Sequence, residues 1–117
     1  MGLELDEDDV RPPAVFTSEE VEALARAIHD GEAAMRRARQ ESFWSWEEGC
    51  ADSERWPGSM PDKVRQQAID EARAALAAYS SMGHGYVVFL RMTLATPGLT
   101  EYQRARIRPV VAALEKR

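Results

Sequence analysis

The sequence predicts an all-α protein, a compact four-helix bundle-like single domain with an acidic N-terminal arm. Apolar residues recur every three or four positions over most of the chain, which is the spacing of one helix face. Two periodic segments follow a Ser/Thr-x-x-Glu/Gln capping pattern, and the single β-branched run has no second run to pair with. We therefore expect helices at 18–42, 61–81, 86–95 and 100–115 around one core. A length of 117 residues with 44% hydrophobic composition fits one globular domain, which we place at 17–117.

The acidic arm is predicted to cover residues 1–16. Residues 1–20 hold seven acids and one base, a charge of -6, whereas the rest of the chain carries +1, which together give the net charge of -5. The segment lacks helical periodicity, and the pair Pro12-Pro13 disfavours a helix there. We expect the arm to lie outside the core, so deleting residues 1–13 should change the melting temperature by only a few degrees.

The first helix begins with Thr17-Ser18-Glu19-Glu20, in which Thr17 and Glu20 can cap each other's backbone amides. Its apolar face carries Val21, Leu24 and Ile28 at helical spacing. Gly31 interrupts this pattern at a cost of about 1 kcal/mol relative to alanine.

The long first connection follows, because residues 47–59 are rich in Gly, Ser, Asp and Pro. Pro61 suits the first turn of the second helix, where a missing N–H costs nothing. That helix presents an alanine-rich face, which would let another helix approach closely: Val64, Ala68, Ala72, Ala75, Leu76 and Tyr79.

The segment from Tyr86 to Leu94 is almost continuously apolar. Its β-branched and aromatic residues also suit a strand, and this alternative stays open. Because a lone strand is not stable, we predict a buried central helix that is the most buried segment of the protein. Leu90→Asp should therefore unfold the chain.

The last helix begins with a second capping box, Thr100 to Gln103, and turns Ile107, Val110 and Leu114 inward. Pro109 falls inside this helix and is expected to kink it, since proline removes one backbone hydrogen bond and clashes with the preceding turn.

Tryptophans and arginines gather around the long connection. Trp and Arg are the usual anchors of protein interfaces, so this group is a candidate partner-binding surface. The alternative is that the aromatic rings close one end of the core. Residues two positions apart diverge on a helix, so one of the Trp-x-Trp rings should be the more exposed. The candidate partner-binding residues are Trp44, Trp46, Trp56, Arg36, Arg37 and Arg39.

The last helix is basic, and Arg104, Arg106 and Arg108 form a candidate nucleic-acid-binding surface. The alternative is a solvated helix face. A whole-chain pI near 5.1 argues against a dedicated nucleic-acid-binding protein, whose domains commonly have a pI above about 9.

Several classes of site have no sequence support. Cys50 is the single cysteine, so neither an intrachain disulfide nor a cysteine-based zinc cluster can form. His29 and Glu32 share a helix face, but the Glu-x-x-His pattern of di-iron sites is absent. We find no phosphate-binding loop, zinc-protease motif or nucleophile elbow, and we predict no cofactor and no metal.

The start of the chain is acidic rather than basic and apolar, and no run is long enough to span a membrane. We expect a cytoplasmic protein. Arginine outnumbers lysine by 13 to 2, which indicates a GC-rich, bacterial or phage, source.

These observations favour a non-enzymatic protein that acts by binding another protein, as an inhibitor, immunity-type or assembly/adaptor protein. A second copy of the chain is one candidate partner. The alternative function is an accessory nucleic-acid-binding subunit, and a small enzyme ranks third.

Overall fold

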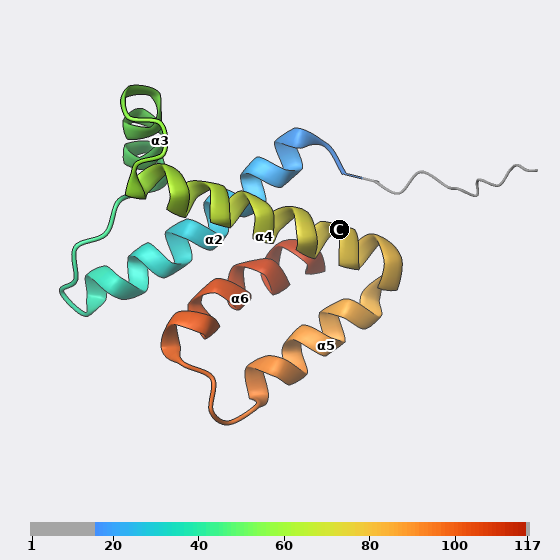
Figure 1. The fold of residues 1–117 in the computed structure, drawn as a ribbon. Coiled ribbons are helices and arrows are strands. Elements are labelled where there is room, and N and C mark those ends of the chain that lie inside the picture. The colour runs from blue at the N-terminus through green and yellow to red at the C-terminus, as the bar shows by residue number, and fades with distance from the viewer. Residues whose placement is uncertain (1–15, 117) are drawn as a thin grey trace, which may run out of the picture.

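The computed structural model describes residues 16–116, which form five α-helices and no strand (Figure 1). The predicted all-α class is confirmed for this part of the chain, and residues 86–95 are helix rather than strand. The predicted acidic arm lies outside the described residues. The helices are α2 (Ser18–Ala38), α3 (Trp46–Arg55), α4 (Met60–Met82), α5 (His84–Ala95) and α6 (Glu101–Glu115).

The core lies where α2 packs against both α4 and α6. Helix α3 packs mainly on α4, and α5 packs on α4 and α6 only (Figure 1). The alanine-rich face of α4 is confirmed, because Ala68, Ala72 and Ala75 are buried and bring its backbone close to its neighbours. α3 and α5 do not contact each other. They therefore flank the core as separate additions to the central three helices.

Helix starts are fixed by side-chain caps. Both predicted capping boxes are present, one from Thr17 to Glu20 and one from Thr100 to Gln103. A third capping box joins Ser45 to Glu48 and opens α3, within the segment predicted as the long connection. That prediction is wrong for residues 46–55. The helix forms despite its weak propensities because it is capped and anchors the buried Trp46 in the core.

Gly31 lies within α2 and does not end it. A Cβ atom at this position would lie 2.8 Å from the carbonyl oxygen of Ala105 and 2.9 Å from Cγ of Pro109. Pro109 has no N–H to donate to that carbonyl, and α6 continues through it to Glu115. The missing side chain of Gly31 therefore lets α2 and α6 approach at the point where proline interrupts the hydrogen bonding of α6.

The prediction that Tyr86 to Leu94 is the most buried segment is wrong. Only Val87 and Leu90 of α5 are buried, whereas Val88, Phe89 and Met92 are 42%, 55% and 66% exposed. The helix is apolar around most of its circumference, but α4 and α6 cover one side only. The uncovered side is the main departure from the expected bundle.

Candidate functional site

Within residues 16–116, an apolar surface along α5 and at the end of α4 is left uncovered. We call it the α5 face and define it as Met82, Val88, Phe89 and Met92, which are 54%, 42%, 55% and 66% exposed. The last three follow the i, i+1, i+4 spacing of one helix stripe, which begins with the exposed Gly85. Exposed apolar patches on this scale mark interaction sites more often than single exposed side chains do.

The α5 face carries no charge. Arg91 is the single charged residue of α5, and its guanidinium pairs with the carboxylate of Glu115 on α6. The centre of a protein interface is typically depleted of charged residues and enriched in aromatic and methionine side chains. The composition of the surface therefore fits protein binding.

An apolar hollow of about 240 Å³ lies between α4, α5 and α6, and Tyr86 and Leu90 line it from α5. The ring of Tyr86, which lines the hollow, stacks on the ring of Phe89 with centroids 6.2 Å apart. Burial raises the pKa of the Tyr86 phenol, so the hydroxyl stays protonated at neutral pH. Phe89 thus joins the exposed stripe to the rim of the hollow. The lining residues include Ile28, Ala75, Leu90, Ile107 and Val110, with Glu71 and Arg106 beside them.

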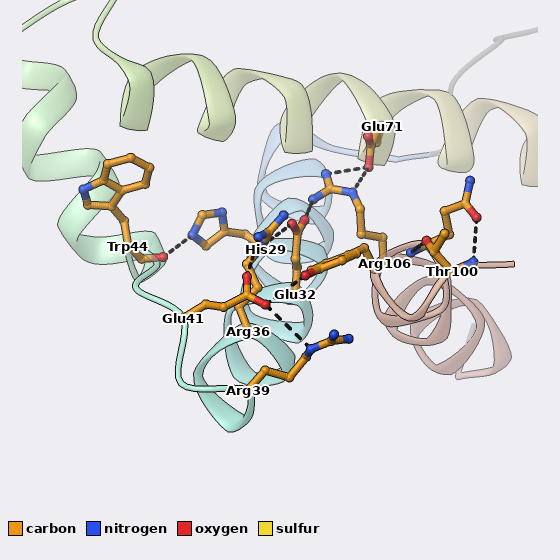
Figure 2. Close-up of polar contacts among 11 residues, drawn as sticks. His29, Glu32, Arg36, Arg39, Glu41, Trp44, Glu71, Thr100 and Arg106 are labelled. Atoms are coloured by element: carbon orange, nitrogen blue, oxygen red, sulfur yellow. Dashed lines mark hydrogen bonds and ion pairs between the residues drawn. The ribbon is translucent and has the colours of Figure 1, made fainter.

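Glu32, the buried carboxylate of the described chain, lies at the centre of a second feature, which we call the Glu32 cluster. It comprises Glu32, Arg36, Glu41, Glu71 and Arg106 (Figure 2). The carboxylate of Glu32 accepts hydrogen bonds from Arg36, at 2.7 Å, and from Arg106. Arg106 also donates to Glu71 at 2.7 Å, and Arg36 donates to Glu41 at 2.9 Å. The cluster joins α2, α4 and α6.

Electrostatics in this cluster favour the ionised state of Glu32. Burial raises the pKa of Glu32, but hydrogen bonds from Arg36 and Arg106 outweigh it, and the net pKa lies below the usual 4.5. The hydrogen bond to Glu32 raises the pKa of Arg36 further. Each charge therefore has a fixed opposite partner, which suits structural support of the helix packing rather than proton transfer.

The structure separates the three tryptophans that were predicted to form one surface. Trp46 is 3% exposed and lies in the core, so it presents no binding surface. Trp44 precedes α3 and Trp56 caps its far end, which is roughly 15 Å away for a ten-residue helix. Trp44 is 38% and Trp56 is 62% exposed. Trp44 is more exposed than Trp46, as predicted, but the reason differs from the expected divergence on a helix, because Trp44 lies outside α3.

The arginines of the same predicted site lie at the end of α2 and its following turn, and all three have local partners. Arg36 belongs to the Glu32 cluster, and its guanidinium lies over the rings of Phe43 and Tyr102 at 4.9 and 4.4 Å. Arg37 donates to the carbonyl of Phe43 at 3.0 Å. Arg39 pairs more loosely with Glu41 at 3.7 Å. Arg37 and Arg39 remain about half exposed, so they are the accessible part of this surface.

The three arginines of the candidate nucleic-acid surface do not share one face of α6. Arg106 turns inward to Glu32 and Glu71. Arg104 donates to the carbonyls of Leu94 and Thr96 and so ties α6 to the end of α5. Arg108 is the exposed member of the three. Two of the three guanidinium groups are therefore already engaged within the chain.

His29 and Cys50 are the remaining reactive groups of interest. His29 is 2% exposed, and its Nε2 lies 2.6 Å from the carbonyl oxygen of Trp44 (Figure 2). Burial raises the pKa of the Cys50 thiol, which lowers its reactivity. Between residues 16 and 116, no three His, Cys, Asp or Glu side chains come together in a way that could hold a metal ion.

The signal that could have revealed the α5 face is the absence of a polar side on residues 86–94. A helix that is apolar all round is either enclosed or faces something other than water. The prediction of enclosure is wrong, because Val88, Phe89 and Met92 are exposed among the described residues.

Comparison with known proteins found no matching family, no matching curated protein and no matching solved structure. None of the helices described here is both long enough and apolar enough to cross a lipid bilayer.

Proposed function

We propose that this protein acts without catalysis, by binding another protein through the α5 face, as an inhibitor, immunity-type or assembly/adaptor protein. The observation that supports the proposal is the uncharged surface of Met82, Val88, Phe89 and Met92, each 42–66% exposed. Covering such side chains removes apolar area from water, which is the main favourable contribution to protein association.

The surroundings of this face also favour binding. It lies on a helix held by α4 and α6, so its side chains are presented from a fixed backbone. A rigid element with an aromatic side chain at its centre loses little conformational entropy on binding. Phe89 is the best candidate for such an anchor, because its ring is already stacked on Tyr86.

The alternative, nucleic-acid binding through Arg104, Arg106 and Arg108, has less support. Phosphate binding needs free cationic groups that can displace the counterions of the nucleic acid, and two of these three are occupied by the chain's own oxygens. A steep loss of binding as salt rises would favour this alternative, whereas binding through an apolar face should depend little on salt.

The proposal is tested by capturing partners from host cells with the tagged full chain and with two matched variants. Phe89→Glu places a charge on the α5 face, whereas Met60→Glu places one on a residue that is 60% exposed at the other end of α4. We expect wild type and Met60→Glu to retain the same partner and Phe89→Glu to lose it. Circular dichroism should show that all three proteins are folded. Equal capture by Phe89→Glu would overturn the proposal.

A further inference from the structure

We infer that the α5 face binds a second copy of this chain, with the two α5 helices packed antiparallel about a two-fold axis. The inference rests on the proposed function, because it names the partner of the same surface. Two features of the structure favour a second copy, namely the absence of charge on the face and the shapes it combines, and the area of the face sets the expected strength of the dimer.

The charge of the face permits self-association. A two-fold axis packs the same patch of both copies against itself, so a patch charged with one sign would repel its copy. The α5 face has no charged residue, and Arg91 on the same helix is neutralised by Glu115. An antiparallel arrangement also places the N-terminus of one α5 beside the C-terminus of the other, where the helix dipoles attract.

The shape of the face is self-complementary. A two-fold interface uses the same patch on both copies, so this patch must carry both the projecting side chains and the hollow that receives them. Phe89 projects from α5, and the hollow of about 240 Å³ lies on the side of Phe89 that Tyr86 occupies. Tyr86 belongs to that hollow and stacks on Phe89, so the two features are continuous. An apolar side chain of one copy can therefore enter the hollow of the other.

Close approach of the two helices is possible at Gly85. This residue lies one turn before Phe89 on the exposed stripe, and a Cβ atom there would meet nothing within 4 Å. Because Gly85 has no side chain, the surface of the helix is recessed at that point. A side chain from the second helix can occupy the open space.

The area of the face indicates a weak dimer. An aromatic side chain can bury 150–250 Å², so the 55% exposed Phe89 offers roughly 110 Å². The four side chains together offer roughly 400 Å², which is half of the about 800 Å² that each partner buries in a stable complex. The flanking surface of the hollow must supply the rest, and we expect a dissociation constant in the micromolar range.

Sedimentation equilibrium of the full chain over a wide range of concentration tests the inference. We expect wild type to shift from monomer to dimer as concentration rises, and Met60→Glu to behave in the same way. Phe89→Glu and Phe89→Lys should each remain monomeric, because like charges would meet near the axis. An equimolar mixture of the two variants should form dimers again, because the opposite charges then attract.

Each alternative outcome overturns a stated part of the inference. A wild-type chain that remains monomeric at the highest concentration excludes the second copy and leaves the proposed function intact with a different partner. A dimer that Phe89→Glu does not weaken shows that self-association uses another surface. Two monomeric variants that fail to associate when mixed show that Phe89 does not lie near a two-fold axis.

Discussion

Replacing Gly31 with alanine tests the contact between α2 and α6. Helix propensity alone predicts stabilisation, because alanine is favoured over glycine inside a helix by up to about 1 kcal/mol. The structure predicts the opposite sign. The new Cβ atom would lie 2.8 Å from the carbonyl oxygen of Ala105 and 2.9 Å from Cγ of Pro109. A backbone carbonyl and a proline ring cannot rotate away as a flexible side chain can.

The magnitude follows from the difference between these two effects. Overpacking of a well-packed site costs about 1–3 kcal/mol, which exceeds the gain in propensity. We expect Gly31→Ala to lower the free energy of unfolding by about 1–2 kcal/mol. For a chain of this length, 1 kcal/mol corresponds to about 4 °C, so the melting temperature should fall by about 4–8 °C.

Gly49→Ala provides the matched control, because Gly49 also lies inside a helix. A Cβ atom there would lie 3.7 Å from the carbonyl oxygen of Pro61, which is an ordinary contact. This variant should gain stability by up to about 1 kcal/mol. Thermal melts followed by circular dichroism at low protein concentration measure both changes without a contribution from association. The reasoning is refuted if Gly31→Ala raises the melting temperature as Gly49→Ala does.

Three further outcomes are expected. Gln40 has φ +64 at the end of α2, so Gln40→Gly should raise the free energy of unfolding in urea by about 0.5–1 kcal/mol, and a decrease would contradict this. Trp46→Ala should lower the free energy of unfolding by about 3–5 kcal/mol because the indole is buried, whereas Trp56→Ala should change it by about 0.5 kcal/mol or less. Equal effects of the two substitutions would contradict the assigned burial. The folded pKa of Glu32 lies below its ordinary 4.5, so its contribution to stability is full above that pH and is lost as pH falls through the folded value. The free energy of unfolding, measured in urea, should therefore fall more steeply below pH 4.5 for wild type than for Glu32→Gln. Parallel dependences of this free energy on pH would contradict the assignment.

Local patterns predicted most of the helices. The capping boxes at Thr17 and Thr100 place the starts of α2 and α6, because a cap is decided by residues three positions apart. The same rule applies at Ser45, but the Gly, Ser and Asp residues that follow it favour a loop. There, the burial of Trp46 against distant residues outweighs local propensity, and the sequence does not reveal that contact.

The candidate site depended on contacts that local patterns do not encode. Arg106 meets Glu32 across 74 positions of the chain, so its inward direction could not be inferred from the basic character of the last helix. The uncovered side of α5 could not be inferred for the same reason, because it depends on contacts between residues far apart in the chain. Apolar periodicity identifies residues that avoid water, but whether another helix of the same chain covers them depends on the packing of all five helices.

The Glu32 cluster also limits the alternative packings of this fold. Buried ion pairs add little net stability, but removing one partner is costly. A shift of α6 along α2 by one turn would move Arg106 by about 5.4 Å and break its hydrogen bonds to Glu32 and Glu71. Ala105 and Pro109 would move with it, away from Gly31. Two unrelated constraints, one ionic and one steric, therefore select the same registry of α6 along α2.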